Sequence, residues 1–246
     1  MKDYIRKDLD GPNDKICGRK YFEQHNCCEE LDITFNIFYD IYYIFNAANF
    51  NLINAANKDL DISKYETNAE DILRFFLRLE YLKSTILSYR SIEDYIMKII
   101  AFAFNLKDKI TSKEDYENKS KNINYRKIHN KLSKKQKDKE ISKINQIIEK
   151  FHEDENFKKI RDLVNKLKHN NNIKIKELRP ACSFGYSIKN KSNKIIYSSD
   201  WLESETYSIE ELVDLCYKTN PVIVNYVEDI YSIIVTKYSD YPIESL

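Results

Sequence analysis

Glycine and proline are rare in this chain of 246 residues, which contains 3 Gly and 4 Pro. Strand-rich folds use many of both residues in their turns, so their scarcity favours long helices with few connections. The sequence also contains no P-loop, no Gly-rich dinucleotide turn and no HExxH zinc motif. These absences argue against the nucleotide-binding and zinc-protease classes that depend on such motifs.

Long apolar runs and an excess charge of one sign are missing as well. No run is apolar enough to span a bilayer, and the polar start "MKDYIRKDLDGPNDK" is unlike a secretion signal. The 40 Lys and Arg residues nearly balance the 39 Asp and Glu residues, so nucleic acid could be attracted by a local patch only. We therefore expect a cytoplasmic protein with no membrane segment and no cofactor.

The chain offers few clustered metal ligands. Its five cysteines show no paired zinc spacing, and we expect them to be reduced thiols; they are Cys17, Cys27, Cys28, Cys182 and Cys216. The four histidines lie far apart in the sequence. The stretch "HEDE" (His152 to Glu155) could bind a metal loosely, but we interpret it as a solvated turn before a helix. The prediction is a protein without a metal site.

What the sequence does contain is helical periodicity, with 42% hydrophobic and 32% charged residues. We predict an irregular arm over residues 1–28 and a single helical domain over residues 29–246. A lysine-rich connection at about 107–140 is interpreted as a solvated linker with a short helix around 125–132. Two short runs rich in β-branched and aromatic residues flank "KNKSN", which predicts a small β-hairpin near residues 181–199.

Local signals refine the expected helix boundaries. Thr67 to Glu70 and Ser208 to Glu211 are both spaced as capping boxes. Ser91 suggests a second helix start or a kink, and Pro221 should kink or break the last helix because it lacks an N–H. The whole pattern predicts an all-α bundle with one inserted hairpin.

The stretch "KKIRDLVNKLKHNNN" raises the question of function. It places Arg161, Asn165 and His169 at steps of four residues near the end of a short helix. An arginine can grip phosphate, a histidine can transfer a proton near neutral pH, and an asparagine can position a substrate. That set suits metal-free RNA cleavage by attack of the 2′-hydroxyl on the neighbouring phosphate. The alternative is a polar, exposed helix end, where cations are favoured by the helix dipole.

The segment "RDLVNKLKHNNN" resembles the signature helix of the HEPN family. These are all-helical domains, and many are metal-independent ribonucleases of toxin–antitoxin, abortive-infection and other antiviral systems. The order of elements is similar too: a long apolar helix containing "SIEDYIMKIIAFAFNL", a polar connection, the "KIRDLVNKLKH" helix and a final long helix. The resemblance covers about residues 70–238 and implies a HEPN-like bundle.

The family motif is an Arg, usually followed by a polar residue, and then a His after four to six intervening residues. Asn165 and His169 match the Asn and His of the common Arg-Asn-x-x-x-His form, but Val164 stands where that form has its Arg. The nearest arginine, Arg161, has seven residues before His169, one more than the usual range. HEPN sites are usually shared across a dimer, so Arg161 of one chain could serve His169 of another.

Two hypotheses follow from this resemblance. The first is a metal-independent endoribonuclease with a toxin or antiviral role, in which Arg161, Asn165 and His169 are catalytic. The second is a catalytically inactive HEPN-like module for dimerisation, RNA binding or protein interaction. Expected partners are RNA, a second copy of the chain and an antitoxin or other defence protein. The cationic run "NKLSKKQKDK" (Asn130 to Lys139) could contact RNA phosphates, or it could be a solvated linker.

Overall fold

The computed structural model describes residues 29–106, 112–135, 138–169, 173–178, 187–189, 191–193, 195–198 and 206–238. Within these residues, seven α-helices contain most of the chain and the strands are short, so the all-α prediction is confirmed. The predicted arm, residues 1–28, lies outside the described residues. The division into an arm and one domain therefore stays a prediction.

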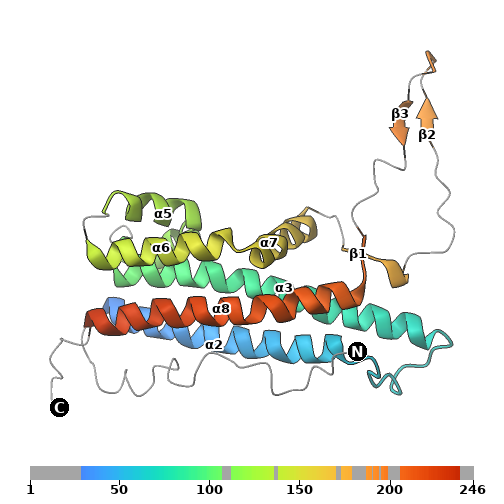
Figure 1. Ribbon diagram of the computed structural model, residues 1–246, viewed down its shortest axis with the longest axis horizontal. Helices are drawn as coiled ribbons and strands as arrows, with labels where there is room; N and C mark the ends of the chain where they lie inside the picture. Colours follow the sequence, from blue (N-terminus) through green and yellow to red (C-terminus); the bar gives the residue numbers. More distant parts are fainter. Residues whose placement is uncertain are drawn as a thin grey trace.

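Three long helices form the body of the molecule: α2 (Glu29–Ala56), α3 (Glu70–Ala103) and α8 (Ile209–Tyr238). They pack against one another and lie side by side in Figure 1. Their shared core is aromatic and β-branched, and burying each large side chain contributes roughly 1.5–3 kcal/mol. Its fully buried side chains include Phe38, Phe45, Tyr89, Ile92 and Ile230.

A buried polar contact joins these three helices. The amide nitrogen of Asn220 donates to Asn49 Oδ1 at 2.8 Å and to the Tyr89 hydroxyl at 3.1 Å. Each residue comes from a different long helix. Satisfying these groups inside the core avoids the penalty of an unpaired buried amide.

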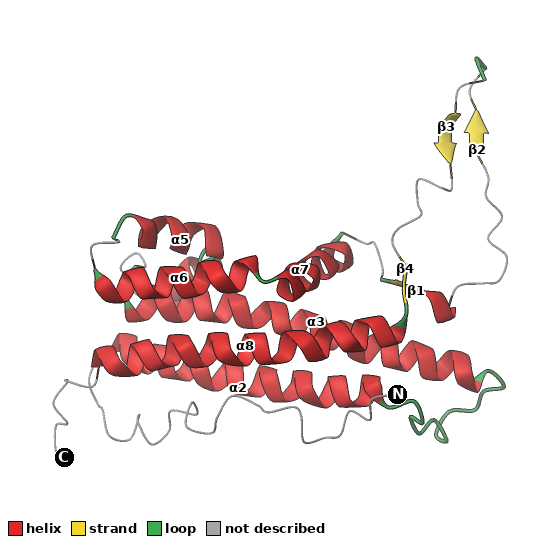
Figure 2. Ribbon diagram, in the orientation of Figure 1, coloured by secondary structure: helices red, strands yellow, loops and turns green. Residues whose placement is uncertain are grey.

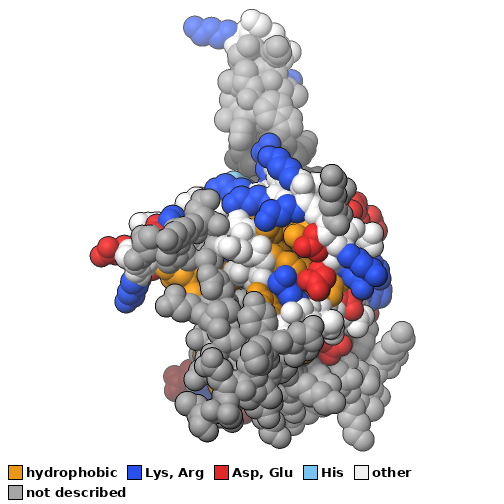
Figure 3. All heavy atoms as spheres, turned by 90° about the vertical axis from the view of Figure 1, so that its left-hand side faces the viewer, with side chains coloured by type: hydrophobic (Ala, Val, Ile, Leu, Met, Phe, Trp, Pro, Cys, Tyr) orange, Lys and Arg blue, Asp and Glu red, His pale blue; other side chains and the backbone are white. Residues whose placement is uncertain are grey.

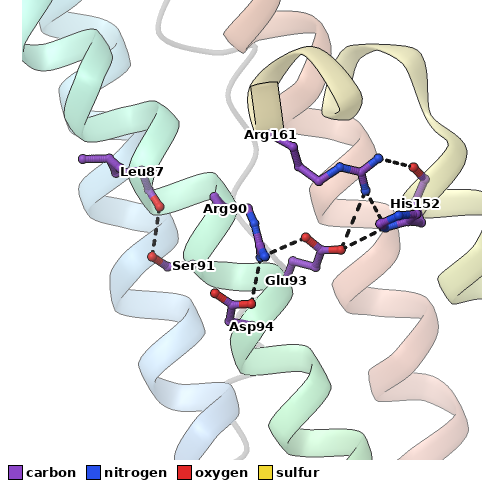
Figure 4. Close-up of polar contacts among 7 residues, drawn as sticks. All are labelled: Leu87, Arg90, Ser91, Glu93, Asp94, His152 and Arg161. Carbon is purple, nitrogen blue, oxygen red and sulfur yellow. Dashed lines mark hydrogen bonds and ion pairs between the residues drawn. The ribbon is translucent and has the colours of Figure 1, made fainter. Parts of the chain in front are cut away.

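Helix α3 is continuous, so the predicted second start at Ser91 is wrong. The Ser91 hydroxyl donates to the Leu87 carbonyl at 2.9 Å within the helix (Figure 4). The true end follows Ala103, where Asn105 adopts a left-handed φ of 47°. The Leu106 N–H then reaches back to the Ala101 carbonyl at 2.8 Å, which is a Schellman cap built on Asn in place of Gly.

Two helices, α4 (Lys113–Lys121) and α5 (Tyr125–Ser133), occupy much of the 107–140 connection. The predicted helix around 125–132 is confirmed, and α4 is a second helix that the interpretation as a solvated linker did not predict. Residues 107–111 and 136–137 of this connection lie outside the described residues. Ile128 and Leu132 lie one turn apart and are both buried. Two apolar anchors and capped N-termini are enough to fold a lysine-rich segment onto the bundle.

Helices α6 (Lys139–Glu153) and α7 (Glu155–Lys168) follow one another around Asp154. Asp154 caps the N-terminus of α7 by accepting from the Phe157 N–H at 2.9 Å. The apolar residues of both helices face the core, among them Ile144 and Ile148 of α6 and Ile160 and Val164 of α7. Helix α7 has His169 as its C-cap, as the sequence predicts.

Two pairs of short strands complete the described structure (Figure 2). Strands β2 (Ser187–Lys189) and β3 (Ile195–Ser198) pair antiparallel, which confirms the predicted hairpin. Strands β1 (Lys174–Ile175) and β4 (Thr206–Tyr207) pair in parallel just before α8, and the sequence did not predict this pair. A 3₁₀ turn, η2 (Lys176–Leu178), follows β1.

Three further predictions concern the capping boxes of α8 and α3 and the proline within α8. The capping box of α8 is confirmed, since the Ser208 hydroxyl accepts from the Glu211 N–H and the Glu211 carboxylate accepts from the Ser208 N–H. The box at Thr67 is wrong, because Thr67 instead accepts from the Ala69 N–H, two residues on. Of the two alternatives for Pro221, a break is wrong, because α8 runs through this exposed proline while core contacts hold its opposite face. A kink at Pro221 stays a prediction.

Candidate functional site

Arg161 does not point toward solvent, because its side chain is held by contacts within the protein. Its side chain is 16% exposed. Its Nη2 donates to the His152 carbonyl at 2.6 Å, its Nη1 contacts His152 Nδ1, and the same nitrogen lies 3.8 Å from Glu93 Oε1. Figure 4 shows all three groups converging between α3, α6 and α7. The interpretation of Arg161 as part of an exposed helix end is therefore wrong.

Glu93 of α3 is the centre of this cluster. Its carboxylate is 2% exposed and lies between two arginines, since Arg90 Nη1 approaches Oε2 at 2.9 Å. The Arg90 contact is an ion pair without hydrogen-bond alignment, so Oε2 is a buried oxygen with no hydrogen-bond donor among the described residues. Arg90 also pairs with Asp94 at 2.8 Å. A carboxylate this deeply buried is tolerable because cations flank it on both sides.

His152 completes the cluster as a neutral base. Its ring stacks on Tyr125, with centroids 3.7 Å apart and planes at 5°. Burial lowers the pKa of His152 and the Arg161 guanidinium lowers it further, against the opposing effect of Glu93. A guanidinium can only donate, so His152 Nδ1 accepts from it and the ring proton is assigned to Nε2. Nδ1 also lies 3.3 Å from Glu93 Oε1, and with the proton on Nε2 neither of these two atoms can donate to the other.

The direction of the Arg161 side chain has a simple cause. Side chains on an α-helix tilt toward the N-terminus, so Arg161 reaches back along α7 toward its start at Asp154. His169 lies in the opposite direction, about 12 Å along the axis and rotated by about 80° around it. Arg161 also passes over the Phe157 ring, at 5.4 Å from the centroid. The two motif residues therefore face different neighbours.

Asn165 and His169 lie together on another surface, in an open groove of about 890 Å³ between α7, β4 and the start of α8. Both side chains are exposed. The backbone carbonyl of Asn165 accepts a helical hydrogen bond from the His169 N–H at 3.2 Å. Arg161 does not line this groove. The structure thus brings together two of the three predicted site residues and separates the third.

Charged residues of both signs line the groove. Its lysines are Lys159, Lys166 and Lys218, and its acids are Asp162, Glu211 and Asp214. Two of the acids are already paired: Asp214 with Lys218 at 2.7 Å, and Glu211 with Lys176 outside the groove at 3.0 Å. Lys166 donates to the Tyr207 hydroxyl at 3.1 Å. Lys159 is exposed and has no side-chain partner within the described part of the chain.

Val164 occupies the position that the family motif gives to Arg, and it is a core residue. It is 1% exposed and lies beside Leu163, which is equally buried. An arginine here would have to place its charge in the apolar interior or distort α7. The absence of Arg is thus part of how this helix packs.

No group of three or more His, Cys, Asp or Glu residues that could hold a metal ion occurs among the described residues. The "HEDE" stretch is divided by the α6–α7 junction, and its His152 is engaged as above. The interpretation of His152 as part of a solvated turn is wrong. Cys216 is buried and free, and burial raises the pKa of its thiol, so it is not a reactive thiolate.

The Glu93 cluster was missed at the sequence level, although a signal was present. Glu93 stands on the apolar stripe of α3, four residues after Tyr89 and three before Ile96, both fully buried. An acid on the core face of a helix requires a cation from a neighbouring element. The sequence does not say which of many basic residues supplies that cation.

Comparison of the chain with known protein families, with curated proteins and with solved structures gives no match. In the regions that the structure describes, the helices are too short or too polar to serve as a membrane span. The family, the cytoplasmic location and the activity therefore stay predictions.

Proposed function

We propose that this protein is a HEPN-like helical module that binds single-stranded RNA in the α7–α8 groove without cutting it. The observation that carries the proposal is the separation of Arg161 from His169. Arg161 is occupied by His152 and Glu93, and Val164 is packed in the core. The helix therefore presents its histidine and asparagine without the family arginine.

The groove retains groups suited to a polyanion. Lys159 and Lys166 supply positive charge, and lysines contribute much of the affinity of proteins for nucleic acid by neutralising phosphates. Asn165 and His169 add hydrogen-bonding side chains that can contact a base edge or a 2′-hydroxyl. Because Asp214 and Glu211 are neutralised by lysines, the acids of the groove oppose an RNA strand less than their number suggests.

A second candidate is the ribonuclease itself, and one observation favours it: His169 and Lys166 line the same groove. A lysine there could take the part of the arginine and stabilise charge on the phosphate. His169 would then accept the 2′-hydroxyl proton while that oxygen attacks the phosphorus. The P–O5′ bond breaks, and the leaving 5′-oxygen takes a proton from water. The products would be a 2′,3′-cyclic phosphate and a 5′-hydroxyl.

One experiment separates the two candidates. A labelled single-stranded RNA is titrated with the protein at low salt, binding is followed by fluorescence anisotropy, and the same samples are run on a denaturing gel. We expect saturable binding and intact RNA, with weaker binding by Lys159→Ala. The matched control is Lys143→Ala, an exposed lysine on α6 outside the groove.

The outcomes are distinct. Absence of binding, or equal loss from both lysine variants, would refute the RNA-binding proposal. Cleavage that disappears in His169→Ala, together with no cleavage of the matching DNA, would establish the second candidate.

The other expected partners also stay proposals. A homodimer is consistent with large apolar side chains left open on α2, among which Phe50 is 63% exposed and Tyr43 is 55% exposed. Light scattering at micromolar protein decides this point, and a monomer contradicts it. An antitoxin or other defence protein has no assigned contact surface.

A further inference from the structure

The outer face of α2 carries little charge. The exposed positions described on this helix form one stripe: Asn36, Tyr39, Asp40, Tyr43, Asn46, Ala47 and Phe50. Asp40 is the one charged residue in this stripe, and the sequence of α2 contains no Lys or Arg. By contrast, half of the exposed positions described on α8 are charged, namely Glu210, Glu211, Lys218 and Asp229. Figure 3 likewise shows basic and acidic side chains beside one another on one end face of the molecule.

The composition of this stripe is that of a protein–protein contact. Aromatic residues are enriched and charged residues depleted at the centre of such interfaces. The hydroxyls of Tyr39 and Tyr43 are hydrogen-bonded to each other, and their rings meet edge to face with centroids 4.7 Å apart. Side chains that are already held lose little conformational freedom when a partner buries them. A nucleic acid or an anionic membrane is a poor occupant, because α2 offers no cation to a phosphate.

The spacing of the stripe fits a second copy of the same helix. Asn36, Tyr43 and Phe50 lie seven positions apart, and the other exposed positions fall between them at steps of three and four. Helices that pack along their length show this spacing. An antiparallel pair with a two-fold axis at Tyr43 matches positions equally far before and after that residue. Every exposed position of the stripe then faces an exposed position of the second copy.

The facing residues are complementary in size and in hydrogen bonding. Tyr39 meets Ala47 of the second copy, so a large side chain lies beside a small one. Asp40 meets Asn46 of the second copy, whose amide can donate to the carboxylate. Neither Asp40 nor Asn46 has a side-chain hydrogen bond or ion pair with another described residue. A parallel pair would bring Asp40 against Asp40, so charge favours the antiparallel arrangement.

We propose that two copies of this chain associate through an antiparallel pair of α2 helices, with Tyr43 at the two-fold axis. The proposal rests on the homodimer expected above and names its surface, but it does not depend on RNA binding. Helix α2 packs against α3 and α8, and Figure 1 shows it on the opposite side of these helices from α7. The dimer therefore leaves both α7–α8 grooves outside its interface, and Arg161 of one chain does not serve His169 of the other.

The test is sedimentation equilibrium of the full chain, which measures the dissociation constant of the dimer. Tyr43→Glu should weaken the dimer by at least about tenfold, because it sets two carboxylates against each other on the axis. The matched control is Asn225→Glu, which adds the same charge to an exposed position of α8. It should change the dissociation constant by less than about twofold.

A second pair of variants tests the register by a gain of affinity, which misfolding does not produce. Asn46→Lys places a cation opposite Asp40 of the second copy, which creates two ion pairs per dimer and should tighten it about two- to tenfold. The matched control is Asn36→Lys, which adds the same charge to the same face but opposite Phe50. It should not tighten the dimer.

The outcomes separate the homodimer from its surface. A monomer at every concentration would refute both and assign the α2 face to another occupant. A dimer that Tyr43→Glu leaves unchanged would keep the homodimer and refute α2 as its surface. Equal effects of Asn46→Lys and Asn36→Lys would refute the antiparallel pairing. RNA affinity is measured separately, so a failure of RNA binding leaves this proposal standing.

Discussion

The two ends of α7 place similar residue types in opposite situations. Toward its start, the Arg161 side chain meets His152 of α6, and both are partly buried and anchored to the buried Glu93. At its end, Asn165 and His169 are exposed and line an open groove. The first pair holds helices together, whereas the second is available to a ligand. A histidine near an arginine is therefore no evidence of a catalytic pair until the direction of each side chain is known.

The difference arises from helix geometry. Arg161 and His169 lie eight positions apart, and the resulting rotation of about 80° is enough to turn one toward α3 and the other toward α8. Each environment then determines the chemistry. The buried end keeps His152 neutral, whereas the exposed end leaves its groups in water.

The largest expected effect comes from restoring the family arginine at the core position. Val164→Arg should destabilise the fold by about 3–5 kcal/mol, because it buries a charge with no partner. Thermal or urea unfolding measures this. Asn165→Arg is the matched control, since it places the same side chain on the next, exposed residue and should melt like the wild type. A Val164→Arg protein that is stable and cuts RNA would contradict our description of this helix.

A smaller loss of stability should follow from removing the guanidinium at the buried end. Arg161→Ala leaves Glu93 with Arg90 as its remaining ionic partner and frees the His152 carbonyl, at an expected cost of about 1–3 kcal/mol. Lys159→Ala, an exposed change on the same helix, is the control. If the two variants melted at the same temperature, the Glu93 cluster would have no structural role.

A pH dependence of stability should arise from His152. Its folded pKa lies below the ordinary value of 6.5, so below pH 6.5 the unfolded chain binds the proton more readily than the folded chain. The free energy of unfolding should therefore fall as the pH drops from 6.5 toward the folded pKa. Above pH 6.5 His152 is neutral in both states, so its effect on the pH dependence should vanish. Urea unfolding across that window should show the slope, and His152→Asn should reduce it. A wild-type stability that rises on acidification through this range would contradict the assignment.

The smallest effect on stability should come from the exposed end. His169→Ala should leave the melting temperature unchanged, because the side chain has no partner among the described residues. RNA affinity should fall about two- to tenfold, the range for one lost hydrogen bond. Anisotropy titrations measure this change. An unchanged affinity would remove His169 from the binding surface.

Much of the fold could be predicted from the sequence, because the spacing of apolar residues and the scarcity of glycine and proline are local properties of the chain. The long helices, the end of α7 at His169 and the α8 cap at Ser208 were all predicted. Continuity through Ser91 and Pro221 was not, since both depend on how one face of a long helix packs against others. The Asn165–His169 surface followed from spacing. The partners of Arg161 did not, because Glu93 and His152 lie 68 and 9 positions away in the sequence.

The most direct test of the central claim is a double-mutant cycle between Arg161 and His169, read out as RNA affinity of folded protein. Arg161→Gln, His169→Ala and the double variant are compared with the wild type, and RNA integrity is checked in every sample. Our account predicts that the two effects add within about 0.5 kcal/mol and that all four proteins leave the RNA intact. A coupling well above that, with cleavage by the wild type alone, would show that the two residues act on one phosphate and would overturn the account.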